Sequence, residues 1–248
     1  MDPALPYCGP APGPATLLTA WNLDPALLVT LGLASAFGMI TLRRAGADLR
    51  RGRAFGIGMA ALVVAFVSPL CALTVALFSA RTVHHLVLLA VAAPALALAF
   101  PLRRVPVQAA WAAVSATLLG WHVPALYTAA WDSALVYWLM QMALLLPAWA
   151  FWSTALARPA DLVAPFGHAA LIAGLAGQMG FLGAVLTFSP RALYPVHLTG
   201  TEPFGLSLLA DQQLSGLIMW VPGMLPLALV AALVLRAGWR QQQRAGAA

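Results

Sequence analysis

The chain contains no lysine, and all 13 of its basic residues are arginine. Only 8% of its 248 residues are charged, whereas 62% are hydrophobic, and the mean hydropathy is +0.87. This shortage of charge excludes an ordinary soluble domain, whose surface needs far more polar side chains. The net charge of +6 does not indicate a nucleic-acid partner, because no basic segment is interleaved with exposed aromatic residues. The composition predicts a polytopic membrane protein in contact with lipid.

Cysteine is also scarce, with only Cys8 and Cys71, which form no CxxC pair. Cys8 falls in the N-terminal segment and Cys71 inside an apolar segment, so we predict no disulfide between them. Residues 1–24 lack lysine, arginine and an apolar core, and are expected to form an exposed tail rather than a signal peptide. The sequence has no phosphate loop, HExxH, GxSxG or kinase pattern, which argues against an enzyme.

Seven apolar segments each approach the ~20 residues that a bilayer-spanning helix needs. They lie at about 25–42, 54–77, 82–100, 107–128, 131–156, 162–188 and 207–235. Because the connections are short, we expect one all-α domain over 1–248, a compact antiparallel bundle of about seven transmembrane helices. Gly180 and Gly183 belong to a series of small residues in the sixth segment that allows close helix packing.

Arginine placement predicts the orientation of this bundle. Eleven arginines fall in the loops at 43–53, 101–106 and 157–161 and in the tail at 236–248, leaving Arg81 and Arg191 for the other side. The positive-inside rule places the former group in the cytoplasm and the N-terminus outside. Four of the five histidines then lie toward the outer face, while His168 falls toward the inner one.

A carboxylate and two carboxamides open the last apolar segment, in the stretch from Asp211 to Gly223. Unsatisfied polar groups cost several kcal/mol in hydrocarbon, so these side chains should face a protein interior or a wet cavity. The alternative is an interfacial start solvated by lipid headgroups. Asp211, Ser215 and Met219 recur at one helix face. Arg81 stands at the outer end of the third segment, and we expect it to pair with Asp211 directly or through one water.

Histidine and methionine supply the candidate metal ligands. His84 and His85 begin the third segment, His122 ends the fourth, and Met140 and Met142 lie in the fifth. Imidazole with thioether suits Cu(I) more than Zn(II) or a hard cation. Adjacent helical residues point ~100° apart, so His84 and His85 should not address one ion. For His85 and His122 a metal or haem-related role, a structural hydrogen bond and a partner contact all stay open, and for the methionines core packing is favoured.

Several stretches resemble the multi-spanning CtaG family of cytochrome c oxidase assembly factors. They include Trp21-Asn-Leu-Asp-Pro25, Ser68-Pro-Leu70, Phe78-Ser-Ala80 with His85-Leu86, Ala93-Pro94, Trp121-His-Val-Pro-Ala-Leu-Tyr127, Phe151-Trp152, Leu186-Thr-Phe-Ser-Pro190 with Tyr194-Pro195, and Asp211-Gln212-Gln213-Leu-Ser-Gly-Leu-Ile-Met219-Trp220-Val-Pro-Gly223. The stretches from Trp121 to Tyr127 and from Asp211 to Gly223 are the specific ones.

The resemblance implies a non-enzymatic role in producing an active haem–copper oxidase in the bacterial inner membrane. Oxidase subunits would be its partners and copper its possible cofactor. Two positions depart from the family pattern, because Arg81 stands where the family has a first histidine and Gln141 where it has another. The preferred hypothesis is aid to copper-centre formation at the outer face. A metal-free scaffold for an oxidase subunit and a copper or small-solute transporter are the rivals.

Overall fold

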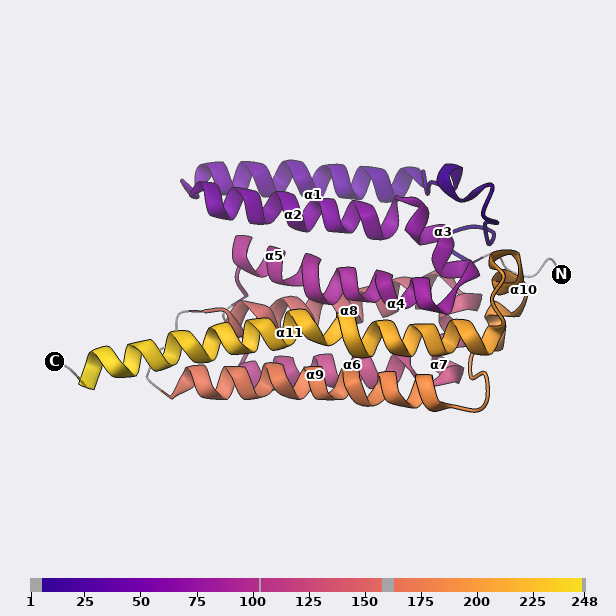
Figure 1. Ribbon diagram of the computed structural model, residues 1–248. Coiled ribbons are helices and arrows are strands. Elements are labelled where there is room, and N and C mark those ends of the chain that lie inside the picture. Colours follow the sequence, from indigo (N-terminus) through magenta and orange to yellow (C-terminus); the bar gives the residue numbers. More distant parts are fainter. Residues whose placement is uncertain (1–5, 103, 158–162, 247–248) are drawn as a thin grey trace.

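The computed structural model describes residues 6–102, 104–157 and 163–246, and within these ranges it is a bundle of helices without a β-strand (Figure 1). Its principal helices are α1 (Pro25–Arg44), α2 (Leu49–Phe66), α3 (Pro69–Ala76), α4 (Phe78–Leu86), the π-helical η2 (Val87–Ala92), α5 (Ala93–Ala99), α6 (Val107–Trp121), α7 (Pro124–Asp132), α8 (Ala134–Ala155), α9 (Ala164–Phe188) and α11 (Leu208–Gly246). The C-terminal segment from residue 236 to 246 is therefore a continuation of α11.

The number of membrane spans agrees with the sequence. Among the described residues, five helices are long and apolar enough to cross a membrane, or up to seven if each of two bent pairs is one span. The bends lie between α2 and α3 (44°) and between α6 and α7 (80°). Pro69 and Pro124 open the second helix of each pair, where proline is tolerated because its missing N–H has no helical partner. The predicted all-α membrane bundle is confirmed, although the segments expected at 54–77 and 107–128 are bent.

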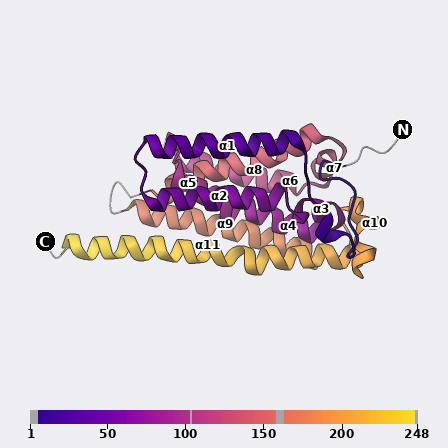
Figure 2. The same ribbon diagram turned by 90° about the horizontal axis from the view of Figure 1, so that it is seen from above.

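The two termini lie at opposite ends of the bundle (Figures 1 and 2). The end near the N-terminus also carries α3, α7 and the short elements η1 (Leu17–Thr19), η3 (Pro195–His197), α10 (Leu198–Thr201) and η4 (Glu202–Phe204), and is called the α10 end below. The loop between α1 and α2 and the end of α11 lie at the other end. Two arginines used in the orientation argument, Arg103 and Arg158, lie outside the described residues.

The N-terminal segment is fastened to the bundle at the α10 end. Asn22 donates its backbone N–H to the Val67 carbonyl (2.9 Å) and its side-chain amide to the Phe66 carbonyl (3.1 Å). Cys8 and Cys71 form a disulfide with a Cα–Cα distance of 5.4 Å, so the prediction of no bridge is wrong. The break after Phe66 is the reason, because it places Cys71 in the first turn of α3 at the bundle end instead of deep inside a straight span.

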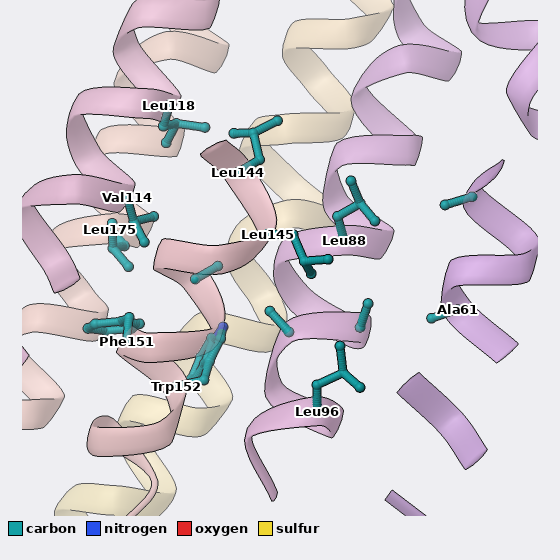
Figure 3. Packing of buried hydrophobic residues seen from close by; sticks show 14 of the residues in the cluster. Ala61, Leu88, Leu96, Val114, Leu118, Leu144, Leu145, Phe151, Trp152 and Leu175 are labelled. Carbon is teal, nitrogen blue, oxygen red and sulfur yellow. The ribbon is translucent and has the colours of Figure 1, made fainter. Parts of the chain in front are cut away.

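Close backbone approach joins α9 to α11. A Cβ added to Gly183 would lie 2.7 Å from the Gly216 carbonyl oxygen, and one added to Gly180 would lie 2.8 Å from the Met224 sulfur. The predicted role of small residues is therefore confirmed at these two positions. Figure 3 shows the core between the helices, where Leu88 faces Leu145. The Trp152 indole donates to the Leu89 carbonyl of the π-helical segment (2.9 Å), which supplies a partner where the α-helical hydrogen-bond ladder is interrupted.

Candidate functional site

A layer of polar residues lies one helical turn from the leucine core, toward the α10 end. Leu88, Leu118 and Leu144–Leu145 mark one level of the bundle in Figure 3. One turn of about 3.6 residues along each helix leads to the next level. That level holds His84 and His85 of α4, Met140 and Gln141 of α8, and His122 at the end of α6, together called the polar layer here. The fold thus assembles residues that are distant in sequence.

The histidines of α4 have unused hydrogen-bonding capacity. His84 is completely buried, and its ring lies edge-on to Phe66 (centroids 5.2 Å apart) and 5.6 Å from the ring of His85. Neither ring nitrogen of His84 has a hydrogen-bond partner, and the nearby Ala65 backbone does not meet hydrogen-bond geometry. The Nε2 atom of His85 is also buried without a partner. Buried polar atoms are normally bonded, so these three nitrogens suggest a ligand.

His122, at the end of α6, lies near His85 and not near His84. It is close enough to His85 for an electrostatic interaction, whereas the ring of His84 packs on Phe66 of α2. His122 Nδ1 lies 2.7 Å from the Leu118 carbonyl oxygen, and a hydrogen bond there requires the proton on Nδ1, leaving Nε2 as the lone-pair atom. The arrangement agrees with the expectation that the adjacent histidines point in different directions.

Gln141 adds a second polar group without partners. It is completely buried, and neither its amide nitrogen nor its oxygen makes a hydrogen bond. On the same face of α8, one turn to either side, Tyr137 lies over Arg81 (5.9 Å from ring centroid to Cζ) and Leu145 faces Leu88. Gln141 therefore lies at the level of His84 and His85 on α4.

The two methionines fall on different sides of α8. Met140 is completely buried at the level of the polar layer. Met142 instead lines a cavity with Asp24, Thr30 and Trp138, between α8 and the start of α1. A shared ligand role for both thioethers is thereby disfavoured, and Met140 is the one placed with the histidines.

Arg81 lies one turn beyond the polar layer and is only 4% exposed. Its guanidinium Cζ lies 5.4 Å from the Tyr127 ring centroid, Nη2 donates to the Thr74 carbonyl (3.4 Å), and Nε has no partner. Cation–π contact with two tyrosines compensates part of the buried charge. Within the part of the chain that the structure describes, no ion pair joins Arg81 to Asp211, so the predicted direct pairing is wrong.

Asp211 has different partners. Its carboxylate accepts the backbone N–H groups of Phe78 (2.6 Å) and Ser79 (3.2 Å) and the Ser79 hydroxyl. These are the first N–H groups of α4, whose own N-cap residue, Leu77, offers no side-chain acceptor. A residue of α11 therefore caps α4, with negative charge at the positive end of the helix dipole.

The face of α11 that the sequence singled out does contact α4. One turn beyond Asp211, the Ser215 hydroxyl lies 2.5 Å from that of Thr82, and Met219 is buried as well. The prediction that Asp211, Ser215 and Met219 share an inward face is confirmed. The polar opening of α11 is therefore protein-facing, which contradicts the alternative of headgroup solvation for Asp211.

The remaining polar and aromatic candidates on α11 lie outside the polar layer. Gln212 fixes the preceding loop by accepting from Leu193 N–H (2.6 Å) and donating to the Arg191 carbonyl (3.1 Å). Gln213 is half-buried, and Trp220 is 37% exposed beside Phe188. Gln212 therefore has a structural role, and Trp220 packs against Gly183 and Phe188 of α9.

Sequence reasoning gave no role to His197, which is completely buried at the α10 end. Its Nε2 lies 2.7 Å from the Tyr127 hydroxyl and its Nδ1 lies 3.2 Å from the Val75 carbonyl oxygen, so both nitrogens are used. Burial, with a smaller contribution from the positive charge of Arg81, lowers the pKa of His197 to about 3. His197 is a structural histidine, in contrast to His84.

This pKa predicts a loss of stability on acidification. The folded protein keeps His197 neutral, whereas the unfolded chain takes up a proton below its ordinary pKa of 6.5, so stability falls as the pH drops from about 6.5 toward 3. We expect the segment from 195 to 204 to become accessible to limited proteolysis at pH 5. The His197→Gln variant should show a smaller change between pH 7 and pH 5, and an equal change would contradict the assignment.

Fold and site together define a polytopic helical membrane protein with a buried imidazole and carboxamide layer near one end. A family model described as cytochrome c oxidase caa3 assembly factor (Caa3_CtaG) matches residues 35–113 and 106–242. The chain belongs to this family, as the resemblance of its motifs predicts. Neither a curated protein nor a solved structure matches the chain.

Proposed function

We propose that this protein assists the assembly of a caa3-type cytochrome c oxidase in the bacterial plasma membrane, without enzyme activity of its own. Its partners in this role are subunits of the oxidase, and its contribution is to the formation of a copper centre at the outer face. Membership of the caa3 assembly factor family supports the role in oxidase assembly. The role in copper-centre formation is supported by the buried imidazole nitrogens of His84 and His85 that have no hydrogen-bond partner.

The donor types suit copper as a transient cargo. Among the described residues, no group of three or more His, Cys, Asp or Glu side chains is placed to hold a metal ion. Cu(I), however, accepts low coordination numbers and binds imidazole and thioether. The polar layer offers His85 with His122 on one side and His84 on the other, with Met140 at the same level. An incomplete ligand set favours transfer of the ion over its permanent retention.

A metal-free scaffold is the second candidate, and Arg81 favours it. This buried cation lies one turn from the polar layer and is close enough to His84 and His85 to interact with them electrostatically. A positive charge at that position opposes the entry of another cation. In this alternative the protein holds an oxidase subunit while another protein delivers the metal.

Deletion of the gene tests the proposed role in oxidase assembly. Cells without this protein should still produce oxidase polypeptides but should contain little active haem–copper oxidase, as measured by cytochrome c oxidation and by immunoblotting of subunits. Normal oxidase activity in the deletion strain would refute the proposed function. If these cells lack active oxidase but take up copper normally in the same cultures, the protein acts in assembly and not in copper transport.

Orientation is a separate prediction, supported by two observations. Most of the arginines in the described ranges lie away from the α10 end, and disulfides such as Cys8–Cys71 persist in oxidising compartments outside the cytoplasm. A fluorescent or phosphatase reporter fused after Gly246 should report a cytoplasmic location, and one inserted in the loop 191–203 an external one. The reverse pattern would move the polar layer to the cytoplasmic side and contradict the outer-face proposal.

A further inference from the structure

The Cys8–Cys71 disulfide has an environment that differs from that of a purely structural bridge. Both sulfurs are within hydrogen-bonding distance of a polar group: the Tyr137 hydroxyl lies 3.5 Å from Cys8 Sγ, and the Asn22 side-chain amide donates to Cys71 Sγ (3.7 Å). A disulfide sulfur has no hydrogen to give, so the tyrosine is the donor. Such donors add little to a stable disulfide, but they stabilise the thiolates that appear when it opens.

The two sulfurs are unequal in access and in stabilisation. Cys8 is 8% exposed and lines a groove of about 520 Å³, together with Asn22 and Ala72, whereas Cys71 is completely buried. Cys71 is also the third residue of the eight-residue helix α3, where the helix N-terminus favours negative charge. Cys8 is therefore the sulfur open to attack, and Cys71 is the better leaving group.

We propose that Cys8–Cys71 is a thiol–disulfide exchange site whose substrate is a dithiol, either a protein or a small molecule, that approaches through this groove. A thiolate of the dithiol attacks Cys8 Sγ, the Cys8–Cys71 bond breaks, and its electron pair stays on Cys71. The second thiolate of the dithiol then attacks its own sulfur in the mixed disulfide and releases Cys8. The dithiol is oxidised to a disulfide, and Cys8 and Cys71 receive its two electrons and two protons.

Exchange has a structural consequence at the α10 end. In the oxidised protein the disulfide ties the N-terminal segment to α3, and Tyr7 stacks on Tyr137 (5.0 Å) and packs against Trp138 (5.0 Å). Trp138 contacts Phe66, which in turn contacts His84 of the polar layer. Reduction removes the covalent tie and leaves the hydrogen bonds of Asn22 and the ring contacts of Tyr7 to hold the segment.

Kinetic measurements on the full-length protein in detergent test the proposal, with dithiothreitol as the dithiol. The disulfide should open under native conditions, as followed by maleimide mass tagging and mass spectrometry. Asn22→Ala should slow the opening about fivefold or more, because the Cys71 thiolate loses its donor. Thr19→Ala, in the same groove without contact to sulfur, should leave the rate unchanged. Opening that occurs only at the rate of global unfolding would overturn the proposal.

Single-cysteine variants give a second test that does not depend on the Asn22 variant folding. Cys71→Ser leaves Cys8 at the groove, and Cys8→Ser leaves the buried Cys71. Oxidised glutathione should form a mixed disulfide with Cys8 at least about tenfold faster than with Cys71. Equal or reversed rates would refute the assignment of Cys8 as the attacked sulfur.

Discussion

Replacing Asp211 with alanine should remove most of the folded protein from the membrane. The substitution leaves the buried N–H groups of Phe78 and Ser79 without an acceptor, at about 1–3 kcal/mol for each. It also removes the negative charge from the N-terminus of α4. Asp211→Asn should be milder, since its amide oxygen still accepts a hydrogen bond. The amount of monodisperse protein after detergent extraction, and its thermal stability, measure the effect.

Matched variants separate this capping role from other causes. Gln213→Ala, on the same turn of α11 but half-buried, should retain nearly normal stability. Ser79→Ala removes only the hydroxyl bond to Asp211 and should have an intermediate effect. If Asp211 acts as a helix cap, neutralising Arg81 as well, in an Arg81→Gln, Asp211→Asn double variant, should not restore stability. Restoration would instead indicate a water-bridged ion pair between the two residues.

The fold was largely predictable because hydrocarbon leaves few alternatives. Apolar segments of spanning length with short loops predict a helical bundle. The helices observed begin and end within a few residues of these segments except at the two bends and at the C-terminal end of α11, which continues to Gly246. The sequence shows a proline at each bend, Pro69 and Pro124. Whether a membrane proline kinks a helix depends on its neighbours, however, and Pro222 and Pro226 lie within the continuous helix α11.

The site was predictable in its membership more than in its contacts. Helical spacing correctly placed Asp211 and Ser215 on one buried face. Helical spacing did not reveal that Asp211 accepts from the backbone N–H groups at the N-terminus of α4. Nearly every residue type has a backbone N–H group, so the sequence does not show which one acts as a donor. The disulfide was missed for a related reason: its formation depends on the bend after Phe66 and on Asn22, which together return the N-terminal segment to α3.

The double variant His85→Ala, His122→Ala should accumulate in the membrane yet fail to restore oxidase activity to the deletion strain. His85 Nε2 has no hydrogen bond to lose, and His122 loses one bond to the Leu118 carbonyl of its own helix, so the cost in stability is chiefly the cavity that remains. Loss of imidazole donors should lower copper affinity by an order of magnitude or more, with a matching loss of active oxidase. Oxidase activity per unit of haem, with immunoblots of this protein, provides the measurement.

Copper supplementation and a control histidine decide what a loss of activity means. His168 lies near the start of α9, at the end of the bundle away from the polar layer, and lines a groove with Val230 and Gly238. The His168→Ala variant should therefore restore activity as the unaltered protein does. Added copper should partly rescue the double variant if the layer hands copper to the oxidase, because a weakened site fills at higher concentration. Absence of rescue, with normal accumulation, favours the scaffold, in which these histidines contact a subunit. Full activity of the double variant without added copper would show that neither imidazole takes part in assembly.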